Sequence, residues 1–369
     1  MKFSRRNWLR SASTMTASGL FVNAGISKFY ENSHTPKTGE IILNSNENAW
    51  GPSPNVLKAI QQSSLQSNRY PWQTRQILID RISQLEGIPA DHILLGAGST
   101  EILQLAGLAF GAHGGTIVSS YPTFPLMMQH ATGFNAKWIK VDLDRNFNHD
   151  FEALKKAAQN AQLIYISNPN NPLGTLSDKS TLLDFCRSLP STTIAFIDEA
   201  YMEFTDQGLK SSLAKEILSY PNLIVARTFS KIYGMAGLRV GYAYAHPDLI
   251  EKMKHYHIGF EINMPITSLH AAIAATEDQQ FLQDCKQANS SVRNKVGRSF
   301  TDWKVEYVPS QTNFIYFRTE RFDPALVELL AKHQVLIRDY ADQPGYARVS
   351  MGTEEQIDIF LSKAKSFLA

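Results

Sequence analysis

A lysine that follows two hydroxyl residues and precedes an arginine lies just after the apolar run NLIVA, in the segment RTFSKIYGMAGLR at residues 227–239. The apolar run predicts a buried strand, so these polar residues come directly after its end. Thr228, Ser230 and Arg239 are types that bind phosphate, because the arginine adds a forked set of donors to the two hydroxyls. Lys231, partly desolvated beside other cations, is expected to have a lowered pKa and to act as an amine nucleophile.

A carboxylate ends another apolar run, in the segment FIDEAY at residues 196–201. Asp198 in such a position is costly unless it is paired. It is therefore either a cap or a member of a structural ion pair, or it faces a buried cation. Tyr201, three residues further on, could reach the same ligand with its phenol.

Three more segments carry candidate ligands after predicted strands. GAGSTE puts Ser99 and Thr100 at a helix start, where backbone N–H groups and the helix dipole favour an anion. A nucleotide-binding protein is disfavoured, because Glu101 stands where the dinucleotide fingerprint needs its third glycine. YPTFP supplies Phe124, which could lie flat on a planar ligand, although core filling would also explain it. SNPNNPLG supplies Asn171, whose amide could donate to a ligand oxygen, although turn chemistry would also explain the segment.

These segments belong to an alternation of strand-like and helix-like runs from about residue 54 to 260. Such alternation predicts an α/β fold with a mostly parallel central sheet covered on both faces, and ligands bind beyond the carboxyl ends of such strands. Beyond residue 260 the pattern becomes that of a smaller α+β domain. We expect an N-terminal arm and part of the small domain at 36–68, the large domain at 69–260, and the small C-terminal domain at 261–369.

The N-terminus differs in kind from the rest of the chain. SRRNWLR at residues 4–10 precedes a weakly apolar tract rich in small residues. A twin arginine before such a tract resembles a Tat export signal, whereas the alternative is a basic N-terminal arm. We therefore expect residues 1–35 to be an export signal and linker and the protein to be periplasmic, with a cytoplasmic location as the alternative.

Composition excludes several classes of protein. A formal charge of +2, with no basic stripe interleaved with aromatics, argues against nucleic-acid binding. Cys186 and Cys285 give neither a disulfide framework nor a metal spacing, and His255 and His257 lack further ligands at zinc spacing. No apolar run reaches the roughly 20 residues that a membrane span needs. We therefore expect no metal, no nucleic acid and no membrane anchor.

Together, the residues after the strands supply donors for a phosphate and an aromatic ring that could lie on a planar ligand. They also supply a carboxylate for a cation, an amide and a phenol for a ligand oxygen, and the amine of a lysine. Those are the parts needed to bind pyridoxal 5′-phosphate through a lysine. From about residue 40 onward the chain resembles the fold-type I, pyridoxal-phosphate-dependent aminotransferases of class I/II, and is most similar to the histidinol-phosphate aminotransferase family. The motifs that carry this resemblance are NENAWGPSP, RYP, GAGSTE, YPTF, NPNNPLG, DEAYMEF, TFSKIYGMAGLRVGY and ARVSMGT.

The resemblance implies a homodimer that moves an amino group between two small-molecule substrates, an amino acid and a 2-keto acid. It implies catalytic roles for Lys231 as the covalent anchor, Asp198 as the partner of the pyridine nitrogen, and Tyr201. The cofactor-binding residues that it implies, besides these three, are Ser99, Thr100, Phe124, Asn171, Thr228, Ser230, Arg239 and, from a second subunit, Tyr70. The substrate-binding residues that it implies are Arg348 for a carboxylate, Arg338 near the distal group, and Trp50.

Several positions depart from the usual pattern of that family. Thr100 replaces an aspartate and Leu173 a threonine, without touching the cofactor chemistry. Trp50 replaces a tyrosine, and residues 259–262 replace a Pro-Pro-Tyr segment before Asn263; both changes fall where the substrate side chain would lie. An aromatic or phosphorylated amino acid is the expected substrate. The alternatives are a decarboxylase or lyase of the same fold, resembling threonine-phosphate decarboxylases, and an exported non-catalytic binding protein.

Overall fold

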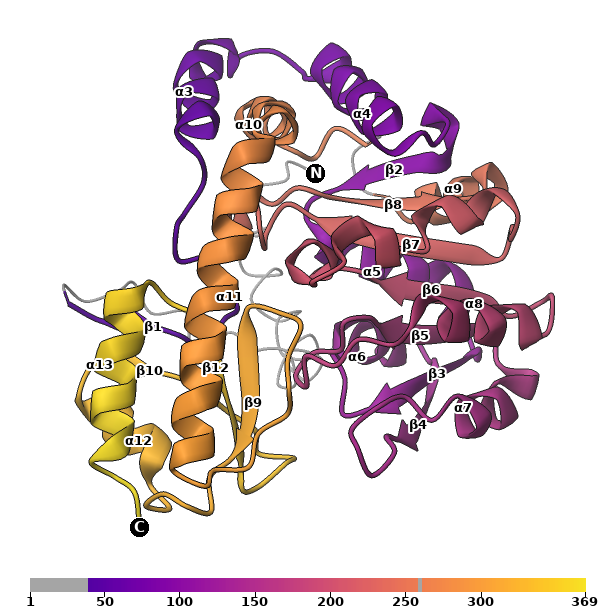
Figure 1. The fold of residues 1–369 in the computed structure, drawn as a ribbon. Helices are drawn as coiled ribbons and strands as arrows, with labels where there is room; N and C mark the ends of the chain where they lie inside the picture. The colour runs from indigo at the N-terminus through magenta and orange to yellow at the C-terminus, as the bar shows by residue number, and fades with distance from the viewer. Residues whose placement is uncertain (1–38, 258–260) are drawn as a thin grey trace, which may run out of the picture. The chain divides into compact units, whose positions relative to one another are not determined.

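A seven-stranded sheet with the order β2-β8-β7-β6-β5-β3-β4 organises the larger part of the chain (Figure 1). The computed structural model describes residues 39–257 and 261–369. Strand β8 runs in the direction opposite to that of the other six strands. The predicted α/β fold with a mostly parallel sheet is thereby confirmed. Its strands are β2 (Ile93–Gly96), β3 (Thr116–Tyr121), β4 (Lys137–Asp142), β5 (Leu163–Ser167), β6 (Ile194–Asp198), β7 (Leu223–Thr228) and β8 (Gly241–Ala245).

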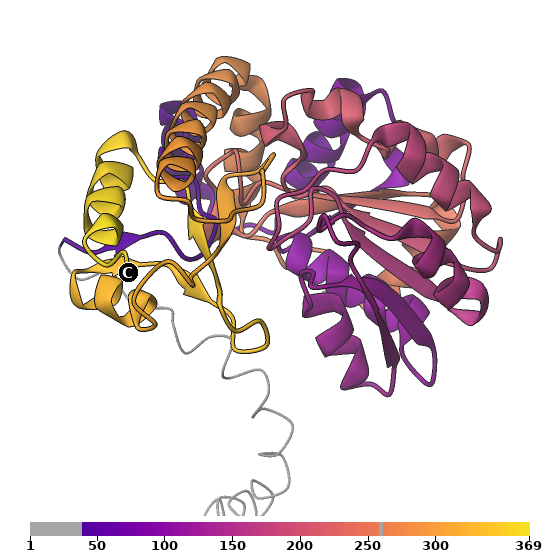
Figure 2. The ribbon, with the colours of Figure 1, turned by 60° about the horizontal axis from the view of Figure 1, so that its bottom comes forward.

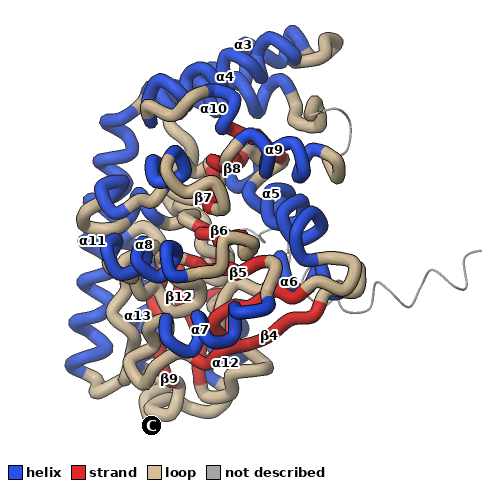
Figure 3. The backbone as a smooth tube through the Cα atoms, turned by 90° about the vertical axis from the view of Figure 1, so that its right-hand side faces the viewer, coloured by secondary structure: helices blue, strands red, loops and turns tan. Residues whose placement is uncertain are grey.

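Helices cover both faces of this sheet because successive strand residues face opposite sides. Ile197 and Val225 enter an apolar cluster with α4, α8 and α10, whereas Phe196 and Ile224 enter a second one with α5, α6 and α9. Figure 3 shows the strands between α8 and the pair α5 and α6. The helices of this part are α3 (Pro54–Ser63), α4 (Trp72–Glu86), α5 (Ser99–Ala106), α6 (Leu126–Thr132), α7 (Phe151–Ala157), α8 (Lys179–Ser188), α9 (Pro247–Lys254) and α10 (Ile266–Glu277).

The C-terminal part builds a separate, smaller sheet, which Figure 2 shows beside the large one. Its order is β11-β12-β9, all antiparallel, and its core gathers Phe300, Phe317 and Phe360. The N-terminal strand β1 (Ile41–Ile42) joins this part by pairing with β10 (Val335–Leu336). The remaining elements are α11 (Gln279–Asp302), β9 (Phe314–Arg318), α12 (Leu326–Lys332), β11 (Arg338–Asp339), β12 (Tyr346–Ser350) and α13 (Glu354–Lys365).

Residues 41–369 form one unit by their contacts, so the expected domain boundaries near 68 and 260 stay predictions. The expected export signal at residues 1–35 lies outside the described residues. None of the helices in residues 39–257 and 261–369 combines the length and apolar character that crossing a bilayer requires. Within the same ranges, no three His, Cys, Asp or Glu side chains come together as a metal site.

A buried ion cluster fixes the strand ends that lie under the predicted site. Arg227, only 1% exposed, contacts Glu199 at 3.1 Å and Glu86 at 2.8 Å, and donates to the Ser212 hydroxyl at 2.6 Å. Removing one member of such a buried ion pair typically costs about 3–5 kcal/mol, because the other charge is left unpaired. The cluster therefore ties β6, β7 and the end of α4 together on the sheet face opposite to Asp198.

Candidate active site

The polar residues predicted at strand ends meet at one edge of the large sheet. Asp198 ends β6 and Thr228 ends β7, and these strands pair in parallel with Asp198 opposite Ala226. Asn171 follows β5, and Phe124 follows β3. Because parallel strands present their carboxyl ends at the same edge, residues far apart in sequence converge there.

Arg239 sits at the centre of a cup of hydroxyl and amide donors. Its Nη2 donates to the Thr100 hydroxyl at 3.1 Å and its Nη1 donates to the Ser230 hydroxyl at 3.4 Å. The Ser230 N–H donates to the Thr228 hydroxyl at 3.1 Å. A side chain on Gly98, which has φ +77° just before α5, would collide with the Arg239 guanidinium. The cup therefore has the donors and the open helix start that a phosphate group needs.

The Asp198 carboxylate is 4% exposed and accepts one hydrogen bond on each oxygen. The Tyr165 hydroxyl donates to Oδ2 at 2.9 Å, and the Ala200 N–H donates to Oδ1 at 3.1 Å. Burial raises the pKa of Asp198 to about 6, against the opposing effect of these hydrogen bonds and of the Lys231 charge. Asp198 is thus ionised above that pH, with lone pairs left for a further donor.

The Lys231 amine is half-buried on the same side of the site. Its Nζ donates to the carbonyl of Asn46 at 3.2 Å and lies 5.4 Å from the centre of the Tyr201 ring. Burial first, and then the charge of Arg348, lowers the pKa of Lys231 to about 8. A lowered pKa for Lys231 is also what the sequence predicts. Because of it, a larger share of this amine is neutral near pH 7.5 than is the case for an exposed lysine.

Arg348, Asn171 and Tyr201 form a connected group. The Arg348 Nη1 donates to the Asn171 side-chain oxygen at 2.7 Å, and the Asn171 amide donates to the Tyr201 hydroxyl at 3.5 Å. The Tyr201 hydroxyl also accepts from the Asn46 amide at 3.0 Å, and burial raises the pKa of Tyr201 to about 12. Arg348 is 7% exposed, and in the described part of the chain its Nε has no hydrogen-bond partner. That Nε is also buried, so it is a donor of Arg348 that no described residue uses.

The other predicted residues lie around this group or apart from it. Arg338 pairs with Arg348 across β11 and β12, and Trp50 packs half-buried against the apolar cores of both parts. Phe124 is half-buried against the cluster that contains α5 and α6. Tyr70, by contrast, is 78% exposed, so it is not enclosed in the site of its own chain.

The structure adds two residues that sequence reasoning missed, Tyr165 and Asn46. Asn46 is 1% exposed and its N–H donates to the hydroxyl of Ser350 at 2.8 Å, while the Asn313 amide donates to the Asn46 carbonyl at 3.1 Å. It thereby holds both Lys231 and Tyr201 in place. A tyrosine in the otherwise aliphatic run LIYIS and the asparagine in the NEN motif were the available signals.

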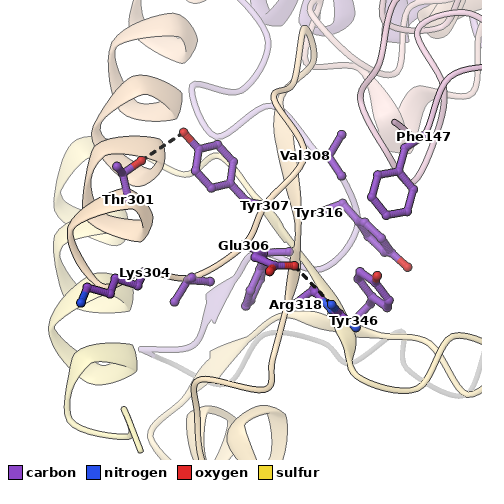
Figure 4. Close-up of a pocket in the computed structure, with 11 residues that line it drawn as sticks. Phe147, Thr301, Lys304, Glu306, Tyr307, Val308, Tyr316, Arg318 and Tyr346 are labelled. Atoms are coloured by element: carbon purple, nitrogen blue, oxygen red, sulfur yellow. Dashed lines mark hydrogen bonds and ion pairs between the residues drawn. The ribbon is translucent and has the colours of Figure 1, made fainter. Parts of the chain in front are cut away.

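A separate cavity of about 480 Å³ lies beside β9 and β12. Figure 4 shows it lined by Phe147, Tyr316 and Tyr346, with Arg318 held by Glu306 at 3.2 Å. Its lining shares no residue with the group around Lys231. The candidate active site is therefore the group at the sheet edge.

These residues fit pyridoxal phosphate. Among the described residues Asp198 takes part in no ion pair, so its charge remains available to a ring N–H. The cup around Arg239 matches a phosphate, and Lys231, within electrostatic range of both Arg239 and Asp198, offers an amine whose pKa is lowered to about 8. Tyr201 and Asn171 together present a phenol and an amide to an oxygen on the ring.

Comparison with known proteins gives the family. The model of the family described as aminotransferase class I and II matches residues 38–363. Histidinol-phosphate aminotransferase 1 of Nitrosococcus oceani is 35% identical over 336 residues, 89% of each chain. The histidinol-phosphate aminotransferase of Moorella thermoacetica is 32% identical over 333 residues, covering 89% of this chain and 86% of the relative.

A solved structure carries the cofactor. The histidinol-phosphate aminotransferase of Sinorhizobium meliloti, in complex with pyridoxal 5′-phosphate, superposes with a TM-score of 0.82 at 28% identity over 88% of this chain and 91% of that one. The match in sequence and fold extends over nearly all of the described residues. The chain is therefore a pyridoxal-phosphate-dependent aminotransferase that belongs to the class I and II family, among the relatives of the histidinol-phosphate aminotransferases.

Proposed function

We propose that this enzyme transfers an amino group between an aromatic or phosphorylated amino acid and a 2-keto acid, with Lys231 as the covalent anchor and proton carrier. The observation that carries the proposal is the arrangement of a lysine with a lowered pKa, a buried carboxylate and a half-satisfied arginine at one sheet edge. A non-catalytic binding protein would need none of these three in such an arrangement.

Pyridoxal phosphate, when bound, supplies an aldehyde for the lysine and a ring that accepts the electron pair from the substrate Cα. The Lys231 amine would then carry the proton that leaves the substrate Cα. Asp198 would keep a proton at the ring nitrogen, and Tyr201 with Asn171 would hold the ring oxygen. Arg239, Thr228 and Ser230, with the backbone at Ser99 and Thr100, hold the phosphate.

The substrate side is shaped by two arginines and a tryptophan. Arg348 has the fork geometry that suits a carboxylate and one donor, Nε, that no described residue uses, and Arg338 lies opposite it on the neighbouring strand. The names of the relatives support a phosphorylated distal group, whereas Trp50 supports an aromatic one. The two classes differ in charge, so a direct screen separates them.

The test is a screen of the first half-reaction. The cofactor-loaded enzyme is mixed in turn with histidinol phosphate, other phosphorylated amines and each aromatic amino acid, and the loss of the lysine-linked absorbance is recorded. We expect the fastest loss with a member of these two classes. Loss with aspartate or alanine alone would overturn the proposed substrate class, and release of CO₂ without a requirement for a keto acid would instead indicate the decarboxylase.

Replacing Arg348 by alanine is expected to raise the KM for carboxylate substrates. A hydrogen bond to a charged group is worth about 1.5–3 kcal/mol, which predicts roughly a 10- to 150-fold increase in KM. Steady-state kinetics with two amino acids and two keto acids measures it. Arg318→Ala, at the separate cavity, is the matched control and should leave KM unchanged; an unchanged KM in Arg348→Ala would remove Arg348 from the substrate site.

We also propose a homodimer in which Tyr70 completes the phosphate cup of the partner subunit. Exposed apolar side chains gather around it along the chain, with Leu65 at 88%, Trp72 at 53% and Ile77 at 52% exposure. Contact with a second subunit would cover exposed apolar side chains of this kind. Tyr70 itself is 78% exposed, as a residue that serves another chain would be.

A mixing experiment tests this shared site. Tyr70→Phe should weaken cofactor binding about tenfold through the loss of one charge-assisted hydrogen bond. At a cofactor concentration that leaves Tyr70→Phe largely unloaded, subunits carrying Tyr70→Phe, unfolded and refolded with subunits carrying Lys231→Ala, should be more active than either variant alone, because each mixed dimer has one site with both native residues. Absence of complementation, in mixtures that sedimentation shows to be dimers, would place Tyr70 outside the partner's site.

A further inference from the structure

Tyr165 is a buried phenol directly under the carboxylate that the cofactor uses. It lies in the middle of β5 with 0% exposure, and its ring stacks on that of Phe196 at 6.0 Å between centroids. Strand β5 pairs in parallel with β6, so that Ser167 lies opposite Asp198 and Tyr165 lies one step deeper on the same face. Its hydroxyl reaches the Asp198 Oδ2 at 2.9 Å.

We infer that Tyr165 is a positioning residue that acts through Asp198, holding this carboxylate in place and keeping the shared proton on the cofactor ring nitrogen. The inference rests on the proposed role of Asp198 and deepens it. The geometry leaves Asp198 little freedom: Oδ2 accepts from the Tyr165 hydroxyl and Oδ1 from the Ala200 N–H, both on the protein side. The lone pairs that remain are free for the ligand.

The chemical consequence follows from competition for one proton. The proton between Asp198 and a ring nitrogen resides mainly on the stronger base. A hydrogen bond donated to a carboxylate stabilises its ionised form and makes it the weaker base. Tyr165 therefore shifts the proton toward the ring, and only the protonated ring accepts electrons well from the substrate.

Three other titratable groups lie within electrostatic range of Asp198. Lys231 favours the ionised carboxylate and Glu199 opposes it, while Tyr201 lies in electrostatic range. Burial, followed by the charge of Asp198, raises the pKa of Tyr165 well above its ordinary value, against an opposing hydrogen bond with Ser167. Tyr165 is thus a protonated donor at neutral pH.

Tyr165→Phe removes only the hydroxyl oxygen from a closely packed position. Nitrogen NMR then shows directly whether the ring nitrogen of the cofactor carries a proton. The variant is loaded with ¹⁵N-labelled pyridoxal phosphate, and the ring-nitrogen shift is followed with pH. We expect the nitrogen shift to move toward that of the neutral ring and the midpoint of its titration to fall by about one pH unit. We also expect kcat to fall about tenfold at unchanged KM, which is the effect of losing one charge-assisted hydrogen bond. An unchanged nitrogen shift would overturn the inference.

Two other variants separate this inference from the proposed function. Asp198→Asn should also move the nitrogen shift; if it does not, the role of Asp198 itself fails. If Asp198→Asn moves it and Tyr165→Phe does not, only the role of Tyr165 fails. Tyr244→Phe is the matched control, because this buried tyrosine belongs to the opposite sheet face, 5.6 Å from the Arg227 guanidinium, and an equal shift there would contradict the inference.

A donor-strength variant covers the case in which Tyr165→Phe does not fold. Incorporating 3-fluorotyrosine at position 165 keeps the hydroxyl and makes it the stronger donor. The midpoint of the ring-nitrogen titration should then rise above that of the native enzyme. A midpoint that stays the same or falls would contradict the inference.

Discussion

Replacing Lys231 by alanine is expected to abolish both amino transfer and the covalent attachment of pyridoxal phosphate. The variant lacks the only amine that the described part of the site places beside Tyr201 and within electrostatic range of Asp198. Loss of a proton-transfer group alone typically slows an enzyme by about 10²–10⁴-fold, and loss of the nucleophile adds to this. Borohydride reduction followed by mass spectrometry should find cofactor bound to the native chain and none bound to the variant.

Control variants separate the effect of losing the Lys231 amine from the effect of losing its positive charge. Lys231→Arg keeps a cation but has no deprotonated form at working pH, so it should be as inactive as the alanine variant. Lys332→Ala, at an exposed position, should behave as the native enzyme. Added methylamine should restore part of the turnover of Lys231→Ala. Near-native turnover of that variant without added amine would remove Lys231 from the mechanism.

The lowered pKa also sets the pH dependence of attachment. Only the neutral amine attacks an aldehyde, and the pKa of Lys231 in the free protein is about 8. Attachment should therefore be slow below that pH and reach its full rate above it. An exposed lysine would reach the same rate only near its ordinary pKa of about 10.4.

Much of this site could be predicted from sequence because its residues follow strongly apolar strands. LIVAR before Thr228 and AFI before Asp198 are fully buried runs, and each ends in polar residues at the same sheet edge. In a parallel sheet that edge collects ligands whatever the rest of the fold. Local pattern and sheet direction thus predict that Lys231, Asp198 and Arg239 follow strands at one sheet edge, whereas their roles toward the cofactor came from the family resemblance and stay predictions.

Long-range side-chain contacts escaped prediction because no local pattern encodes them. Asn46 bonds to Ser350 across 304 positions of sequence, and Arg348 bonds to Asn171 across 177. The Tyr165 hydroxyl has a partner only because β5 and β6 pair in one register. Such contacts depend on the packed arrangement, and they are the ones that fix the angle and pKa of the predicted groups.

The strand register also explains why Asp198, and not its neighbour Glu199, lies on the sheet face of the candidate site. Glu199 is 0% exposed and points to the opposite sheet face, where Arg227 and Ser212 satisfy it. Two adjacent carboxylates thus take different roles: one is neutralised in a structural cluster, the other is left without an ion pair among the described residues. That division makes Asp198 the position where removal of a charge has the largest effect on the ring.

Asp198→Asn is expected to lower kcat by about 100- to 1000-fold, the scale of losing one preorganised electrostatic contact in an active site. The amide is close in size and keeps the packing, but it cannot stabilise a positive ring nitrogen. Stopped-flow measurement of the first half-reaction isolates this step from product release. Asp198→Glu should recover part of the rate, since it restores the charge at the cost of a displaced carboxylate.

The pH dependence of cofactor affinity gives this prediction a second readout. Burial raises the pKa of Asp198 to about 6 in the free protein, so the native carboxylate gains a proton as the pH falls through 6 and can no longer pair with a ring N–H. Affinity for pyridoxal phosphate should therefore drop below pH 6 in the native protein. The cofactor phosphate titrates near the same pH, about 6, and contributes equally to both proteins. The ratio of native to Asp198→Asn affinity cancels that contribution, and a ratio independent of pH from 5 to 8 would show that Asp198 does not meet the ring.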